Sequence, residues 1–118
     1  IMKKYKFTAL IFAIILLYSI AHNGYSINLN DVYAFPVPFI PRIHKFLTIK
    51  ISDATHAKCS IYDINGDVVK KLSGTANIIW NGRNDDGEIV APGLYIIKIE
   101  LEGIGGEYKK KIIRILVQ

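Results

Sequence analysis

The amino-acid sequence predicts an all-β protein, an antiparallel β-sandwich of about seven strands preceded by a signal peptide. Beyond residue 26 no segment shows helical periodicity. Instead, short stretches alternate apolar with polar side chains, and turns that contain Gly or Asn separate them. Alternation with a period of two is typical of strands that bury one face, and closely spaced short strands are typical of sandwiches.

Residues 1–26 have the composition of a secretory signal peptide. Lys3, Lys4 and Lys6 precede an uncharged apolar stretch at residues 7–20, and small residues then offer cleavage after Ser26 or, alternatively, after Ala21. The apolar stretch is shorter than the roughly 20 residues that span a bilayer, which favours cleavage over an uncleaved anchor. We therefore expect an exported chain whose single domain covers residues 27–118.

Removal of the signal peptide would take away most of the excess positive charge. The chain has 15 Lys and Arg against 10 Asp and Glu, and three of those lysines lie in residues 1–26. The remainder is nearly balanced, so we do not expect nucleic acid as a partner. The single cysteine, Cys59, excludes an internal disulfide, and its apolar position in a predicted strand indicates a buried side chain.

Six of the predicted strands follow one another from residue 46 to the last residue. The strongest is residues 93–101, in which Tyr95, Ile97, Ile99 and Leu101 are expected to face the core. The other five cover residues 46–52, 57–63, 67–72, 76–80 and 107–118. Asn65-Gly66 predicts a two-residue type I′ hairpin turn, because both central positions of that turn need positive φ.

Residues 33–41, "YAFPVPFIP", predict an edge strand or an extended lead-in, because proline lacks the N–H that a central strand needs. Phe35, Phe39 and Ile40 are expected to pin this segment to the sandwich, with a PxxP ligand as the alternative. The lysines at 109–111 are expected to be a solvated strand end that discourages pairing between sheet edges.

Residues 81–88 are all polar or glycine, which raises the possibility of a calcium loop or an active site. Aligning Gly87 with the sixth position of an EF-hand loop places Gly82 and Gly93 at the first and twelfth positions, and neither can supply a carboxylate. Asp85 and Asp86 lack an accompanying nucleophile or base. We therefore expect turns, with Gly82 and Gly87 at positive φ, and we expect neither a cofactor nor enzymatic activity.

Taken together, "IYDINGDVVKKL" (61–72), "IIWNGRNDDGEIVAPGLYIIKIE" (78–100) and "KKKIIRILVQ" (109–118) resemble the FlgD-like immunoglobulin-fold domain. The resemblance implies an immunoglobulin-like sandwich. The residues that match the family pattern are Tyr62, Asp63, Gly66, Trp80, Gly82, Asp85, Gly87, Gly93 and Tyr95.

A similar pattern, preceded by a "YPNPFNP"-like stretch, forms the C-terminal sorting domain of proteins exported by type IX secretion. Here "FPVPFIP" (35–41) occupies that place, and Val37 and Ile40 replace the usual asparagines. The resemblance thus implies a non-catalytic extracytoplasmic module for protein interaction, or for sorting and anchoring at the bacterial cell surface. Its partner would be a protein of the secretion machinery or of the surface, met in the periplasm, at the outer membrane or outside the cell.

If the domain is a sorting tag, its expected partner surface lies on the exposed last strand, at Lys109, Lys110, Lys111 and Arg114. A terminal strand at a sandwich edge offers backbone groups to a partner by strand addition. Two alternatives remain at this point. One is an assembly scaffold like the flagellar hook cap, and the other is a remnant of a larger secreted protein.

Overall fold

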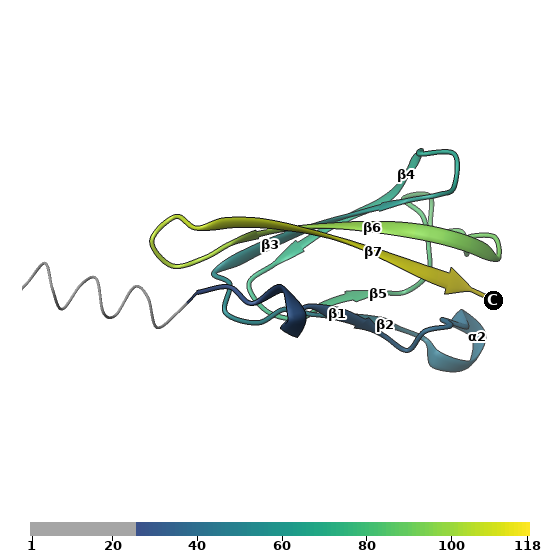
Figure 1. Cartoon of the computed structure of the whole chain (residues 1–118). Coiled ribbons are helices and arrows are strands. Elements are labelled where there is room, and N and C mark those ends of the chain that lie inside the picture. The colour runs from purple at the N-terminus through teal and green to yellow at the C-terminus, as the bar shows by residue number, and fades with distance from the viewer. Residues whose placement is uncertain (1–25) are drawn as a thin grey trace, which may run out of the picture.

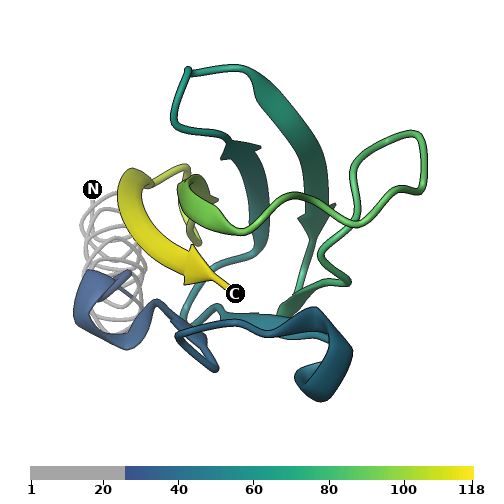
Figure 2. The same ribbon diagram turned by 90° about the vertical axis from the view of Figure 1, so that its right-hand side faces the viewer.

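The computed structural model describes residues 26–118, which form two antiparallel sheets packed face to face (Figure 1). One sheet has the strand order β1-β2-β5, and the other has the order β4-β3-β6-β7. Viewed end-on, the two sheets form separate layers (Figure 2). The buried apolar side chains of both sheets form one core cluster. The predicted sandwich of about seven strands is therefore confirmed, whereas the predicted signal peptide, except for Ser26, lies outside the described residues.

The bounds of the elements agree closely with the predicted stretches. The strands are β1 (Tyr33–Phe35), β2 (Leu47–Lys50), β3 (His56–Tyr62), β4 (Val68–Gly74), β5 (Ile78–Trp80), β6 (Gly93–Glu102) and β7 (Tyr108–Val117). A 3-10 helix, η1 (Leu29–Asp31), precedes β1, and a one-turn helix, α2 (Pro41–His44), follows it. The segment before β2, residues 27–46, is here called the lead-in. Within residues 26–118 no helix is long and apolar enough to cross a membrane.

The inner faces of both sheets carry the alternating apolar residues that the sequence indicates. On β6, Tyr95, Ile97, Ile99 and Leu101 are buried, while the residues between them are not. Cys59 on β3 is 1% exposed, and burial raises the pKa of its thiol to about 12. The expected burial of this cysteine is confirmed, and its thiol stays protonated at neutral pH.

Trp80, on β5, connects the two sheets through aromatic contacts. Its ring centroid lies 5.9 Å from that of Phe39 and 6.0 Å from that of Tyr95 on β6, both in tilted arrangements. The indole Nε1 donates a hydrogen bond to the Arg83 carbonyl at 3.0 Å. Such tilted pairs and a paired indole N–H are the arrangement that a buried tryptophan favours.

The β3–β4 hairpin differs from the predicted type I′ turn. Gly66 has φ +86°, but Asn65 is not at positive φ, so a type I′ turn is excluded. Asp63 Oδ1 accepts hydrogen bonds from the N–H groups of Asn65 and Asp67, and the Gly66 N–H donates to the Asp63 carbonyl. The aspartate thus holds a longer turn in which only the glycine has left-handed backbone.

Residues 33–41 combine the predicted edge strand with the predicted irregular segment. β1 lies at the edge of its sheet, and the residues that follow it belong to no strand. Phe39 is fully buried and forms a parallel bridge with Val117, in which its N–H donates to Leu116 and its carbonyl accepts from Gln118. Phe35, by contrast, is 46% exposed, so the expectation that it pins the segment was wrong. The strand register pairs Phe35 with Thr48, which alternates with the buried Leu47 and Ile49 on β2, so Phe35 lies on the face away from the core.

We expect Trp80→Ala to lower the free energy of unfolding by about 3–5 kcal/mol, because it removes the side chain that fills the space between Phe39 and Tyr95. Trp80→Phe should lower the free energy of unfolding by less, because an aromatic ring remains there. Some loss should persist, because the Arg83 carbonyl loses the indole N–H donor. Urea unfolding followed by far-UV circular dichroism measures both. Equal losses in the two variants would contradict a packing role for the larger ring.

Candidate functional site

The polar loop between β5 and β6 is a double turn whose side-chain oxygens bind its own backbone. Asn81 Oδ1 accepts the Arg83 N–H at 3.1 Å, and Asn84 Oδ1 accepts the N–H groups of Asp86 and Glu88 at 3.0 Å. Gly82 and Gly87 have φ of +75° and +80°, as predicted. The loop thus repeats the design of the Asp63 turn, in which a short polar side chain satisfies backbone donors.

Gly82 lies where the chain approaches the lead-in most closely. A Cβ atom at this position would lie 2.9 Å from Pro41 Cγ and 3.1 Å from Phe39 Cε2. Gly87 has similar backbone geometry but has no other atom within 4 Å of such a Cβ. Gly82 is therefore needed both for its positive φ and for the close packing of the loop against Phe39.

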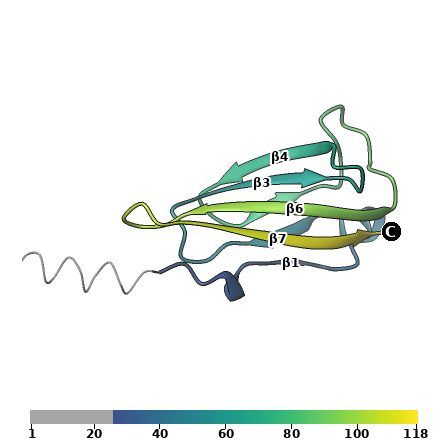
Figure 3. The ribbon, with the colours of Figure 1, turned by 45° about the horizontal axis from the view of Figure 1, so that its top comes forward.

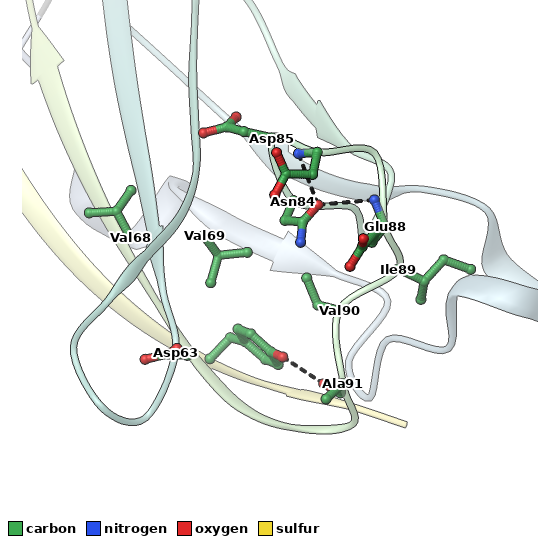
Figure 4. Close-up of a pocket in the computed structure, with 11 residues that line it drawn as sticks. Asp63, Val68, Val69, Asn84, Asp85, Glu88, Ile89, Val90 and Ala91 are labelled. Carbon is green, nitrogen blue, oxygen red and sulfur yellow. Dashed lines mark hydrogen bonds between the residues drawn. The ribbon is translucent and has the colours of Figure 1, made fainter.

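The loop borders a hollow of about 580 Å³ whose far wall is formed by the β4 residues Val68 and Val69 (Figure 4). Acidic side chains at its rim are Asp63, Asp85, Asp86 and Glu88. Asp85 forms an exposed ion pair with Lys70 at 3.3 Å, which contributes little to stability. At the base Tyr95 donates its hydroxyl to the Ala91 carbonyl at 2.6 Å.

Within residues 26–118 no three His, Cys, Asp or Glu side chains are grouped so that they could hold a metal ion. The Asn84 oxygen is already shared by two backbone donors. Of the family-pattern residues in the loop, Gly82 and Gly87 thus have conformational roles, and Gly82 has a packing role as well. Gly93 belongs with them, because its φ of +155° is a conformation that few other residues adopt.

The triple lysine differs from the solvated strand end that we expected. Lys109 and Lys111 lie on the core side of β7 and donate to backbone carbonyls of the lead-in. Lys109 Nζ binds the Ile27 carbonyl at 2.6 Å, and Lys111 Nζ binds the carbonyls of Leu29 and Val32. Strand alternation explains the difference, because only Lys110 and Arg114 fall on the outer face.

The outer face of β6 and β7 carries four apolar side chains around Arg114. These five residues, Leu94, Ile96, Ile112, Arg114 and Leu116, are here called the β6–β7 surface. Leu94 pairs with Leu116 and Ile96 with Arg114 in the strand register. Leu94, Leu116 and Ile112 are 39%, 40% and 53% exposed. The two strands lie side by side along their whole length (Figure 3).

The edge of β7 is open only in its middle. The Phe39 backbone forms hydrogen bonds with the Leu116 carbonyl and the Gln118 N–H, both of which point away from β6. Because backbone groups alternate sides along a strand, those of Lys110, Ile112 and Arg114 point to the same side. No backbone group elsewhere in the described part of the chain bonds to these three residues.

Residues 47–103 match the family model of the FlgD Ig-like domain, from the start of β2 to the turn after β6. The resemblance inferred from the sequence is therefore confirmed over this segment, which is similar to the FlgD Ig-like domain. A comparison with curated protein sequences found no match.

Solved structures from Porphyromonas gingivalis share the fold. PorZ, described as an essential bacterial surface component of the type IX secretion system, matches with a TM-score of 0.61 and 28% identity over 76% of this chain. Dimeric latent PorU matches with a TM-score of 0.55 and 20% identity over 74% of this chain. The matches span only 12% of the PorZ chain and 9% of the PorU chain.

FlgD from Xanthomonas campestris, whose structure was described in connection with hook capping in flagellar assembly, has 28% identity to this chain and a TM-score of 0.44. That match covers 52% of this chain and 49% of FlgD.

We expect Gly82→Ala to destabilise the protein more than Gly87→Ala. Both changes place a side chain at positive φ, which costs on the order of 1–3 kcal/mol. Only the alanine at 82 also displaces Pro41 and Phe39, which should add about 1 kcal/mol or more. Equilibrium unfolding in urea compares the two, and equal losses would show that the close approach at Gly82 has no energetic weight.

Calcium should leave the protein unchanged. Because the oxygens of Asn81 and Asn84 are bound to backbone N–H groups, millimolar calcium should produce no measurable rise in Tm. A rise of many degrees that Asp86→Ala abolishes would contradict the turn interpretation of this loop.

Proposed function

We propose that residues 27–118 form a non-catalytic protein-interaction module of an exported bacterial protein, one that directs or anchors the chain at the cell surface by a route like type IX secretion. The observation that carries this proposal is the likeness to PorZ, which extends over 76% of this chain. PorZ is described as a surface component of that system. The likeness covers one small part of PorZ, as expected for a module that recurs within different proteins.

The β6–β7 surface is the partner surface in this proposal. It places the Arg114 guanidinium among the exposed side chains of Leu94, Ile112 and Leu116. Apolar contact area around an arginine is a composition enriched in protein interfaces. The complementary partner presents apolar side chains and a carboxylate that pairs with Arg114.

The open middle of the β7 edge supplies the second part of the interaction. The backbone groups of Lys110, Ile112 and Arg114 can accept one short added strand from the partner, with side-chain contacts on the β6–β7 surface providing selectivity. Of the four basic residues expected to form the partner surface, Lys110 and Arg114 retain that role in this proposal. Lys109 and Lys111 hold the lead-in instead.

A non-catalytic role is supported by the state of the candidate reactive groups. The Cys59 thiol is buried and protonated, with its pKa raised to about 12. A nucleophilic cysteine instead has an accessible thiol with a lowered pKa. Asp85 is exposed and pairs with Lys70.

The proposal is tested with the full chain in a bacterium that possesses type IX secretion. We expect the wild-type chain to become accessible to protease added to intact cells. The double variant Leu94→Asp, Leu116→Asp should accumulate in the periplasm, because two carboxylates oppose apolar contact and the carboxylate that pairs with Arg114. Protease accessibility and cell fractionation provide the measurements.

The double variant Ile79→Asp, Phe35→Asp is the matched control. Ile79 on β5 and Phe35 on β1 are 54% and 46% exposed in the other sheet, so the two changes add the same charge to a different face. This variant should still reach the surface. Equal loss of surface delivery in both variants, with circular dichroism showing all proteins folded, would contradict the assignment of the β6–β7 surface.

A further inference from the structure

The sandwich begins sharply at Ile27. Ser26 is exposed, whereas Ile27 is 1% exposed and belongs to the hydrophobic core. The Ile27 side chain packs against Gly103, where an added Cβ would lie only 3.0 Å from Ile27 Cδ1. The glycine thus leaves room for this particular side chain at the end of the sandwich.

The backbone of Ile27 is held on both sides by charged residues of β7 and the turn before it. Its N–H donates to Glu107 Oε2 at 3.1 Å, and its carbonyl accepts from Lys109 Nζ at 2.6 Å. The Lys109 ammonium also pairs with Glu107 Oε1 at 3.4 Å. The Ile27 N–H, followed by the Lys109 ammonium, lowers the pKa of the Glu107 carboxyl, so this group is ionised at neutral pH.

A carboxylate with one oxygen on a backbone nitrogen has the geometry that an α-ammonium group requires. In the uncut chain the Ile27 nitrogen has a single proton to donate, and the other carboxylate oxygen receives the Ser26 hydroxyl at 3.3 Å. If Ser26 is removed, that nitrogen becomes an ammonium with three donors and a full positive charge. The same Glu107 carboxylate then binds it by a charge-assisted hydrogen bond.

We propose that the chain is processed at the Ser26–Ile27 bond and that the new N-terminus is bound by Glu107. An endopeptidase of the signal-peptidase class adds one water across the peptide bond. The C–N bond breaks, the water oxygen joins the Ser26 carbonyl carbon to give a carboxylate, and the Ile27 nitrogen takes both water protons to become an ammonium. This inference rests on the export proposed above but not on the β6–β7 surface.

The burial of Ile27 also fixes the order of events. A peptidase needs an extended, accessible chain on both sides of the bond, and the folded sandwich covers Ile27. Processing therefore precedes folding, and the freed residue docks as the sandwich closes. The other candidate bond, after Ala21, would leave the Ile27 nitrogen as a neutral amide.

The first test is the intact mass of the full chain after export. A mass that corresponds to residues 27–118 supports the inference. A product that begins at residue 22, or an uncut chain, overturns it. Failure of surface delivery with a chain that begins at Ile27 would contradict the proposed function alone, so the two results are separable.

The second test measures whether Glu107 recognises the ammonium. Glu107→Gln should lower the Tm of the processed protein by roughly 4–8 °C. The control carries one alanine inserted between Ser26 and Ile27, which moves the charged amine by about one residue length, some 3.3–3.6 Å, and restores an amide at Ile27. In that background Glu107→Gln should lower the Tm by less than half as much, and equal losses would overturn the inference.

A third measurement does not depend on any variant. An amine-selective acylating reagent should modify the α-amine of the folded processed protein at least tenfold more slowly than in urea, because the ammonium is paired and its residue buried. Equal rates, read by mass spectrometry of the N-terminal peptide, would overturn the proposed pairing with Glu107.

Discussion

The whole sandwich depends on the contact of Trp80 with aromatic rings from two directions. Trp80 lies on the short β5, which pairs only with β2, so the sheet that contains it has few backbone hydrogen bonds. Its packing on Tyr95 fastens this sheet to the long β6, and its packing on Phe39 fastens the lead-in. Because the Phe39 backbone bonds to the end of β7, one side chain links both sheets and the C-terminal strand.

Two lysine side chains donate hydrogen bonds to backbone carbonyls that lie outside the strands. The irregular segment before β1 has carbonyl groups that no strand can satisfy, and buried carbonyl groups without partners are costly. Lys109 provides a donor to the Ile27 carbonyl, and Lys111 provides donors to the Val32 carbonyl and to the Leu29 carbonyl, which also accepts the Val32 N–H. Lysine is suited to this task, since its stem packs along apolar surface while its three donors reach several carbonyls.

The sequence was sufficient to predict the strands, because alternation reports directly which residues face a core. It was also sufficient for the loop at residues 81–88, where Asn and Gly positions specify turns. The hairpin at Asn65-Gly66 was misassigned, because Asp63 competes for the same backbone donors and moves the turn by one position. A local pattern does not rank such competing hydrogen bonds.

The roles of Phe35 and of the lysines needed tertiary structure. Whether Phe35 is buried depends on which side of β1 faces the partner sheet, and alternation within three residues is too short to decide it. Lys109 and Lys111 looked like surface charges because the segment that they bind lies far away in the sequence. Residues that contact across such a separation leave no periodic signal.

The bridge between Phe39 and Val117 has a consequence for how molecules of this protein meet one another. The end of β7 is rich in β-branched and aliphatic residues, and such a stretch with a bare edge is a template for fibrous self-assembly. Phe39 blocks one end of that edge, so a second copy finds room for only a short, poorly anchored pairing. The phenylalanine that packs on Trp80 thereby also shortens the sheet edge that a second copy could extend.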